Sequence, residues 1–265
     1  MPDPDLLSLE RDERNVYTLT IRRPEVRNAL NPQAFTELAD ACAQVAGDAS
    51  ARALVITGEG VAFSAGGDFE ALQAMLDGDR SFAEAELRHA NVGIQAVAEL
   101  EVPTVAAVNG DAYGGGAAVA LSTDYRIMSQ SARLGFVFAR LGLSGADTGA
   151  TWWLTRIVGP VRALEIITLG GVFDADEAAA DGLVTATAPA DSFDDVVAEF
   201  VDRIAVLAPM AARANKRALL GIESRTLVEQ LEHEAVIQAE VIGSADFREG
   251  LAATREKRRP VFRGN

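Results

Sequence analysis

Two short glycine turns are the segments of this chain best suited to chemistry. The first is FSAGGD at 63–68, and the second is AYGGGAA at 112–118. Each follows an apolar stretch typical of a buried strand and precedes a run of helix-forming residues. Glycine lets the backbone approach a ligand closely, and the first amides of a helix have no partner within the helix. Both turns therefore predict backbone N–H groups that can donate to an electron-rich atom.

The two turns form one site if the strands that precede them are neighbours. Their N–H groups would then converge on one oxygen atom. Two converging backbone donors form an oxyanion hole, which stabilises negative charge that develops on a carbonyl oxygen. The alternative interpretation is structural: each turn starts a helix, and its glycines allow tight packing. The spacing alone does not decide between the two interpretations.

Other catalytic motifs are absent from the sequence. It contains no Gly-Lys pair, which excludes a Walker-type loop, and the turn at 58–63 lacks the third glycine of a dinucleotide-binding fingerprint. GLSGA at 142–146 is not a G-x-S-x-G motif. His89 and His233 lie outside the apolar faces of their predicted helices, so we interpret both as surface residues. No His, Cys and carboxylate cluster has ligand spacing, so we expect no metal.

The composition indicates a globular protein without nucleic-acid or membrane partners. The chain has 265 residues, of which 49% are hydrophobic, and a net charge of −15 that would repel a phosphate backbone. The longest uncharged stretch, 112–123, is shorter than the roughly 20 apolar residues of a membrane span. The N-terminus lacks the pattern of a signal peptide. Cys42, the single cysteine, lies on an apolar helix stripe. We expect a buried structural thiol and a cytoplasmic protein.

Strands that alternate with helices predict an α/β core in the first part of the chain. The strands are expected at 16–21, 53–57, 105–108, 125–128 and 183–187, and the helices at 32–46, 69–76, 81–100 and 114–122. Asn31 and Asp68 are expected to cap the first two helices, because each side chain can accept from an unpaired amide.

From about residue 160 the pattern is mostly helical. Helices are expected at 161–169, 174–181, 193–207, 210–220, 226–242 and 247–257. No repeat of fixed period and no Pro/Ser-rich linker divides the chain. The predicted organisation is an α/β core over residues 1–200 and a helical region over residues 201–265.

Five segments carry a resemblance to a known family. In order, they are PEVRNALNPQ, LVITGEGVAFSAGGD, VPTVAAVNGDAYGGG, LTRIVGPVRALEI and DEAAADGLV. Together they resemble the enoyl-CoA hydratase/isomerase (crotonase) superfamily over about residues 16–262. The resemblance implies a crotonase-like spiral of ββα repeats with a C-terminal helical trimerisation region, in a homotrimer or homohexamer. It also implies an acyl-CoA thioester substrate whose carbonyl oxygen lies between the amides of Gly67 and Gly115. Coenzyme A would enter only as part of the substrate.

This chain departs from the hydratases that it resembles. Those hydratases use two glutamates, at positions that here hold Ala118 and Phe138. Adding water requires a base that activates it and an acid that protonates Cα. The ordinary hydratase reaction is therefore not expected. Phe138 also replaces the single glutamate of one common type of enoyl-CoA isomerase.

One carboxylate remains in the corresponding region, Asp147 in LGLSGADTGATWWLTR. This stretch is similar to the phenylacetate-pathway isomerase, in which an aspartate is the acid/base. It is also similar to the chlorobenzoyl-CoA dehalogenase, in which the aspartate is a nucleophile, but no convincing histidine partner is present. The alternative is that Asp147 only caps a helix at 148–158. Apolar surroundings would raise its pKa, and the candidates are Phe136, Phe138, Trp152 and Trp153.

We therefore predict an acyl-CoA enzyme of the fatty acid metabolism type that moves a double bond, with Asp147 carrying a proton between Cα and Cγ. Glu70, Asp111 or a neighbouring subunit could supply a second acid. Because coenzyme A is polyanionic, arginines should contribute to binding. The residues expected to bind substrate are Arg27, Ala65, Phe138, Trp152 and Arg259, and Arg23, Arg255, Lys257 and Arg258 are further candidates. The alternatives are a hydratase-like enzyme, an acyl-CoA hydrolase, a non-catalytic acyl-CoA-binding protein and a dinucleotide-binding oxidoreductase.

Overall fold

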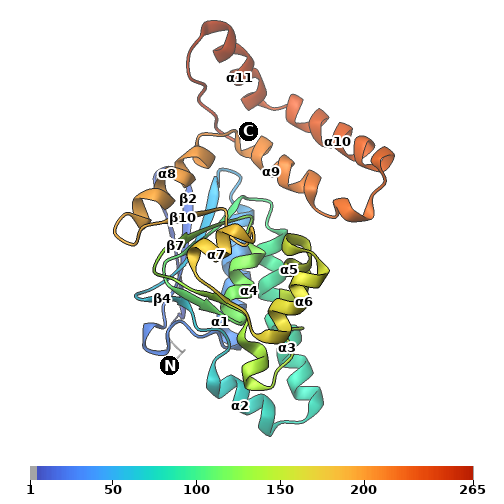
Figure 1. The fold of residues 1–265 in the computed structure, drawn as a ribbon. Coiled ribbons are helices and arrows are strands. Elements are labelled where there is room, and N and C mark those ends of the chain that lie inside the picture. The colour runs from blue at the N-terminus through green and yellow to red at the C-terminus, as the bar shows by residue number, and fades with distance from the viewer. Residues whose placement is uncertain (1–4, 265) are drawn as a thin grey trace.

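The alternating strands and helices form a layered α/β core, and a helical arm projects from it (Figure 1). The structure is a computed structural model, and it describes residues 5–264. Two mixed sheets make up the core: one of six strands and one of four. No helix within residues 5–264 has the length and apolar composition needed to cross a membrane.

The larger sheet positions the strand that precedes each glycine turn. Its order is β1 (Leu7–Arg11), β2 (Val16–Ile21), β3 (Ala53–Gly58), β5 (Thr104–Val108), β7 (Tyr125–Ser129) and β10 (Ala186–Ala188). Only the β1–β2 pair is antiparallel. β3 and β5 are direct parallel neighbours, with Val55 opposite Val105. The strands that precede the two glycine turns are therefore neighbours, as convergence of the turns requires.

The smaller sheet brings the two turns together. Its order is β4 (Ala62–Ser64), β6 (Asp111–Tyr113), β8 (Leu134–Gly135) and β9 (Val172–Phe173). β4 leads into the first glycine turn and β6 into the second, and the two strands pair in parallel with Ser64 opposite Ala112. These strands are two or three residues long, which is too short for an alternating pattern to predict them.

Helices cover both faces of the larger sheet. The helices of the core are α1 (Pro32–Gly47), α2 (Phe69–Asp77), α3 (Arg80–Glu99), α4 (Gly115–Ser122), α5 (Ala150–Val158), α6 (Pro160–Leu169), α7 (Ala175–Ala180) and α8 (Phe193–Ala205), with 3₁₀ turns η1 (Pro24–Val26) and η2 (Val137–Leu141). Every residue of α4 is buried, which its Gly and Ala composition permits. On the opposite face, α8 packs against the sheet through Val197, Val201 and Ile204.

The predicted helix caps are confirmed. Asn31 accepts a hydrogen bond from the Ala34 amide at the start of α1. Asp68 likewise accepts from the amides of Glu70 and Ala71 at the start of α2, and a further cap, a capping box of Asp174 and Glu177, begins α7. Such caps satisfy amides that the helix itself cannot satisfy.

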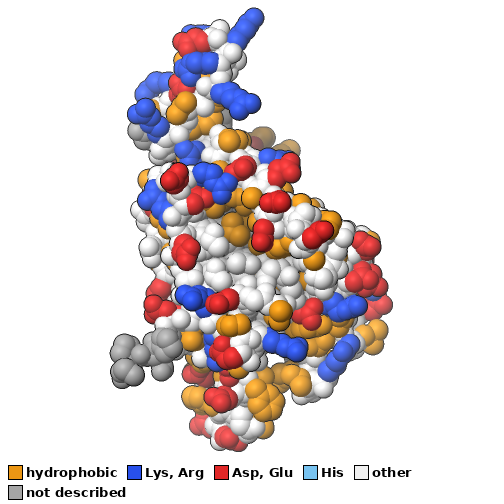
Figure 2. All heavy atoms as spheres, turned by 90° about the vertical axis from the view of Figure 1, so that its left-hand side faces the viewer, with side chains coloured by type: hydrophobic (Ala, Val, Ile, Leu, Met, Phe, Trp, Pro, Cys, Tyr) orange, Lys and Arg blue, Asp and Glu red, His pale blue; other side chains and the backbone are white. Residues whose placement is uncertain are grey.

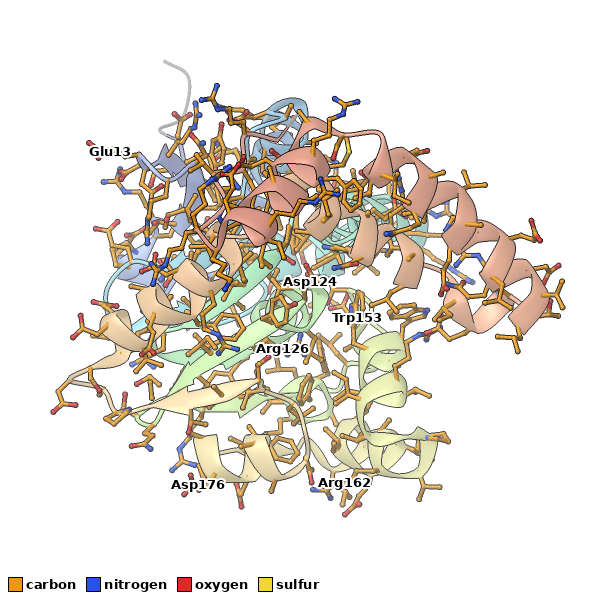
Figure 3. The ribbon with its side chains drawn as sticks, turned by 90° about the horizontal axis from the view of Figure 1, so that it is seen from above. Glu13, Asp124, Arg126, Trp153, Arg162 and Asp176 are labelled. Atoms are coloured by element: carbon orange, nitrogen blue, oxygen red, sulfur yellow. The ribbon has the colours of Figure 1, made fainter. Side chains whose placement is uncertain are left out.

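The C-terminal arm consists of α9 (Pro209–Leu219), η3 (Ile222–Ser224), α10 (Leu227–Ile242) and α11 (Ala245–Glu256), and it extends away from the core (Figure 1). The Lys216 ammonium lies 2.9 Å from the Asp124 carboxylate, which the view from above shows next to the arm (Figure 3). Arg52 donates to the carbonyls of Leu207 and Phe262. Several large apolar side chains of the arm are exposed, including Leu227, Val228, Leu231, Val236 and Leu251. On the face shown in Figure 2, basic side chains gather toward the end of the arm.

Three sequence predictions need correction. The strand expected at 183–187 is β10, at 186–188, because the Leu183 amide closes α7 by donating to the Ala178 carbonyl and its side chain packs in the core. The helix expected from residue 148 begins at Ala150. β1 was not predicted, because its side chains turn progressively more exposed along the strand and leave no clear alternation.

Candidate active site

The first glycine turn is held by two backbone hydrogen bonds on either side of Gly67. The Leu30 amide donates to the Gly66 carbonyl at 2.7 Å, and the Asp68 amide donates to the Leu30 carbonyl at 2.9 Å. Gly66 has a φ of +94°, and a Cβ there would lie 2.6 Å from the Tyr113 carbonyl oxygen. The Gly67 amide itself has no hydrogen-bond partner among residues 5–264. The turn therefore presents one unpaired donor on a restrained backbone.

The second glycine turn begins α4 beside the first. Gly114 caps the helix with a φ of +50°, and Gly115 is its first residue. Within the described chain, the Gly115 amide has no partner either. A Cβ on Gly116 would lie 2.6 Å from the Ser64 carbonyl oxygen, so α4 approaches β4 too closely for a side chain. A Cβ on Gly115 would lie 3.9 Å from the Gly67 nitrogen, which shows how near the two unpaired amides are.

A cavity of about 370 Å³ opens at these turns, and Gly67, Gly115 and Asp147 all line it. Leu30 and the helices α1, α2 and α3 supply an apolar wall, and the helical residues in it include Phe35, Leu72, Met75, Phe82 and Ala90. Such a cavity suits an apolar group that carries one polar function next to the amides.

Asp147 lies between η2 and α5, and its role as a helix cap is excluded. The N-cap of α5 is Gly149, with a φ of +80°, and no side chain caps this helix. Burial raises the pKa of the Asp147 carboxyl, and a hydrogen bond from the Thr148 amide offsets this only in part. The direction agrees with the expectation from the sequence. A partly buried carboxyl with a raised pKa is suited to accepting and returning a proton.

The aromatic residues expected around Asp147 differ in their positions. Phe138 is 5% exposed, and its ring lies 3.6 Å from where a Cβ on Gly114 would be, behind the second turn. Trp152 is 46% exposed on the outer side of α5, and the Arg156 guanidinium stacks 3.4 Å from its ring centre. Trp153 instead packs against the core (Figure 3). Neither Phe138 nor Trp152 lines the cavity.

The other predicted substrate-binding residues also lie outside the cavity lining. Arg27 and Ala65 are exposed neighbours at the first turn, since the Ala65 amide donates to the Arg27 carbonyl at 2.8 Å. Arg259 follows α11 in the arm and is exposed. In Figure 1, α11 and α2 lie at opposite ends of the molecule.

The Arg23 guanidinium interacts with groups of the protein itself, although Arg23 was a candidate for binding coenzyme A. Its Nη1 lies 2.7 Å from an Asp68 carboxylate oxygen and donates to the Ala29 carbonyl at 2.6 Å. Asp68 is confirmed as the cap of α2, accepting from the amides of Glu70 and Ala71. Burial alone would raise the pKa of Asp68, but Arg23 and these two amides lower it overall.

Two further polar residues of the cavity, Glu86 and Thr148, were not predicted from the sequence. Glu86 of α3 lines the cavity, as does Glu70, a predicted candidate for the second acid. The helical spacing of Phe82, Glu86 and Ala90 places them on one face, which was a usable signal. Thr148 is 5% exposed and has a φ of +45°, and its hydroxyl has no partner among the residues described.

The remaining residues that the sequence singled out do not line the cavity. Asp111 accepts from the Arg133 amide. Ala118 is fully buried in α4. Cys42 is buried as expected, and burial raises its pKa to about 12. His89 is exposed, whereas His233 is partly buried, which corrects its interpretation as a surface residue. No group of three His, Cys, Asp or Glu side chains in residues 5–264 is arranged to hold a metal.

Comparison with known proteins gives consistent matches over nearly the whole chain. The family model described as enoyl-CoA hydratase/isomerase matches residues 11–265. The 1,2-epoxyphenylacetyl-CoA isomerase of Escherichia coli is 34% identical over 97% of this chain and 98% of its own length. A Rhodobacter capsulatus protein named "Probable enoyl-CoA hydratase" is 41% identical over 93% of each chain. The crystal structure of an enoyl-CoA hydratase from Bacillus anthracis superposes with a TM-score of 0.92 at 30% identity, over 98% of this chain and 100% of that chain.

Proposed function

Because this chain belongs to the enoyl-CoA hydratase/isomerase (crotonase) superfamily of acyl-CoA enzymes, we propose that it moves a carbon–carbon double bond within an acyl-CoA thioester. One observation carries the proposal: a partly buried carboxyl with a raised pKa, Asp147, lines the same cavity as the unpaired amides of Gly67 and Gly115. The carboxyl is suited to moving a proton, and the amides are suited to stabilising an enolate oxygen.

The mechanism starts with the thioester carbonyl accepting hydrogen bonds from Gly67 and Gly115. This polarisation makes a proton on Cα of a 3-enoyl group acidic, and the Asp147 carboxylate removes it. The resulting dienolate places its negative charge on the oxygen between the two amides. Asp147 then returns the proton to Cγ, and the double bond moves into conjugation with the carbonyl. One carboxyl is sufficient, because it gives back the proton that it removed.

The raised pKa of Asp147 supports this cycle. A carboxylate with an ordinary pKa is a weak base for removing a proton from Cα. Its conjugate acid also loses that proton too readily to hold it until Cγ is protonated. Burial in the cavity makes the carboxylate a stronger base and the carboxylic acid more stable. The same proton can therefore be held through the enolate stage.

Hydration is a second candidate, which a specific feature of the cavity favours. Glu86 and Glu70 line the cavity with Asp147, so a second carboxyl is available to act with it on water. The Rhodobacter relative is also named as a hydratase. A Glu86→Gln variant that loses water addition while keeping double-bond migration would assign Glu86 to that reaction.

We further propose that the arm assembles the chain into a homotrimer or homohexamer, which the exposed apolar side chains of α10 support. Arg27, at the first turn, is proposed to contact the phosphates of coenzyme A beside Ala65. Arg259, in the arm, would act only in such an assembly. Phe138 and Trp152 do not line the cavity, so they are proposed to contact only an acyl group that extends beyond it, toward η2 and α5, respectively.

The test of the proposal is an Asp147→Ala variant assayed for both binding and turnover. We expect its affinity for an acyl-CoA to stay within a few-fold of the parent while turnover falls by at least about 10²-fold, the usual contribution of a proton-transferring side chain. Equal turnover in variant and parent would refute the role of Asp147. A parent that binds many acyl-CoA thioesters and converts none would instead be a non-catalytic binding protein.

A further inference from the structure

Arg23 connects the two chain segments that flank the Gly67 amide. One guanidinium nitrogen, Nη1, reaches both the Ala29 carbonyl at 2.6 Å and the Asp68 carboxylate at 2.7 Å. Ala29 precedes Leu30, whose amide and carbonyl hold the turn on both sides of Gly67. Asp68 follows Gly67 directly. A single side chain therefore bridges the residues on which the orientation of the Gly67 N–H depends.

The backbone of Arg23 is itself fixed from within the core. Its amide donates to the Asn28 side-chain oxygen at 3.0 Å, and its carbonyl accepts from the Asn28 amide at 2.7 Å. Asn28 is fully buried, and its side-chain nitrogen donates to the Ala62 carbonyl at the start of β4 at 2.7 Å. This chain of bonds leads from β4 through Asn28 and Arg23 to Asp68.

The ion pair is largely withdrawn from solvent. The side chains of Arg23 and Asp68 are 16% and 9% exposed. Removing one member of a buried pair leaves an uncompensated charge, and the remaining group then moves toward water or rearranges. Loss of Arg23 would therefore draw the Asp68 carboxylate away from its present position, and the adjoining Gly67 peptide would move with it.

We propose that Arg23 and Asp68 are positioning residues that orient the Gly67 N–H toward the thioester oxygen. This inference rests on the proposed function, because it assumes that Gly67 is an oxyanion donor. Arg23 then acts on the reaction through the backbone and not by holding coenzyme A. Its substitution should weaken polarisation of the carbonyl more than it weakens binding.

A structural role confined to α2 predicts a different result. Asp68 caps α2, and α2 supplies Leu72 and Met75 to the cavity wall. If the pair only anchored this helix, its loss would disturb the acyl wall. The Michaelis constant KM would then rise, while kcat and the polarisation of a bound thioester would stay unchanged.

The experiment measures carbonyl polarisation and kinetics in matched variants. A conjugated trans-2-enoyl-CoA bound to the Asp147→Asn protein reports polarisation through the red shift of its absorbance. We expect Arg23→Gln to remove at least half of that shift in the Asp147→Asn background. With Asp147 intact, kcat should fall by about 10- to 100-fold, part of the roughly 10²- to 10³-fold contribution of one such donor, and KM should change less than about threefold.

The matched control is Arg22→Gln, because the neighbouring Arg22 pairs with Glu59 at an exposed site where both side chains are about half exposed. It should leave the red shift and kcat unchanged within about twofold, as an exposed ion pair contributes little. Arg23→Lys keeps the charge and should recover part of the lost kcat. If Arg23→Gln does not fold, Asp68→Asn carries the same expectation, because its amide oxygen still caps α2.

The two hypotheses fail in different ways. A full red shift and unchanged kcat in Arg23→Gln, with or without a raised KM, would overturn the positioning role alone. No red shift in the Asp147→Asn protein before Arg23 is changed would refute the oxyanion hole of the proposed function.

Discussion

Replacing Gly115 with alanine should separate activity from stability. A Cβ at Gly115 would meet only the Gly67 nitrogen at 3.9 Å and a Leu30 methyl at 4.0 Å, so nothing in the fold has to move. Gly115 is the first residue of α4 and its φ is not positive, so alanine is permitted there. Alanine favours a helix over glycine by up to about 1 kcal/mol. The free energy of unfolding should therefore stay constant or rise by less than that amount.

Activity should change in the opposite direction. A carbonyl oxygen bound by both amides lies about 2.9 Å from each nitrogen. The added methyl group would extend into the space between the two turns, where that oxygen has to fit. Losing one donor of an oxyanion hole costs roughly 10²- to 10³-fold in kcat, or about 2.7–4 kcal/mol. We expect Gly115→Ala to lose this much activity while remaining fully folded.

Urea unfolding and steady-state kinetics on three variants test this reasoning. Gly116→Ala should lose stability by about 1–3 kcal/mol, because its Cβ would lie 2.6 Å from the Ser64 carbonyl oxygen. Gly47→Ala, at the end of α1 with no atom within 4 Å of the added Cβ, should change neither activity nor fold. Activity of Gly115→Ala within about threefold of the parent, in a folded protein, would refute the reasoning.

Three further predictions concern single residues of the core and cavity. Thr148→Val should raise the free energy of unfolding by about 1 kcal/mol in urea titrations, because it removes a buried hydroxyl without a partner in the described chain. A free energy of unfolding lowered by the same amount would contradict this. The pKa of Asp147 is higher in the native state than its ordinary value of 3.8 in the unfolded state. Between these two pKa values the native state binds more protons than the unfolded state. The free energy of unfolding therefore falls as the pH rises from 3.8 through the native pKa. Asp147→Asn should thus stabilise the protein at pH 7.5, and the gain should shrink toward pH 4; a gain independent of pH would exclude linkage to this group. Cys42, with its pKa near 12, should react with a thiol reagent only as fast as the protein unfolds, and rapid reaction of the native protein would contradict its burial.

The central strands of the larger sheet, β3 and β5, were predictable because they are buried on both faces, whereas the edge strand β1 was not. β3 and β5 are nearly continuous apolar runs, and such runs signal a strand even without alternation. The smaller sheet was not predictable, since strands of two or three residues carry no period. Yet the pairing of β4 with β6 is what joins the two glycine turns. The site could therefore be proposed from its turns but not assembled from the sequence.

The residues around the site show a similar division. The glycine turns and the Asp68 cap are local features, and the sequence predicted them correctly. Which tryptophan faces the core is decided by the apolar stripe of α5. Trp153 falls on the same helical stripe as Leu154 and Ile157, and this stripe was available as a signal. The pairing of Arg23 with Asp68 joins residues far apart in the chain, and no local pattern indicates it.

The central claim is that Asp147 moves a proton within a thioester enolate, and one measurement tests it most directly. The protein is incubated with a 3-enoyl-CoA, and the absorbance of the conjugated thioester and the product mass are followed for the parent and for Asp147→Asn. We expect conjugation to appear without a change in mass in the parent, and to be lost in the variant. Water added to a trans-2-enoyl-CoA, with no conjugation formed from the 3-enoyl-CoA, would contradict the claim and favour a hydratase.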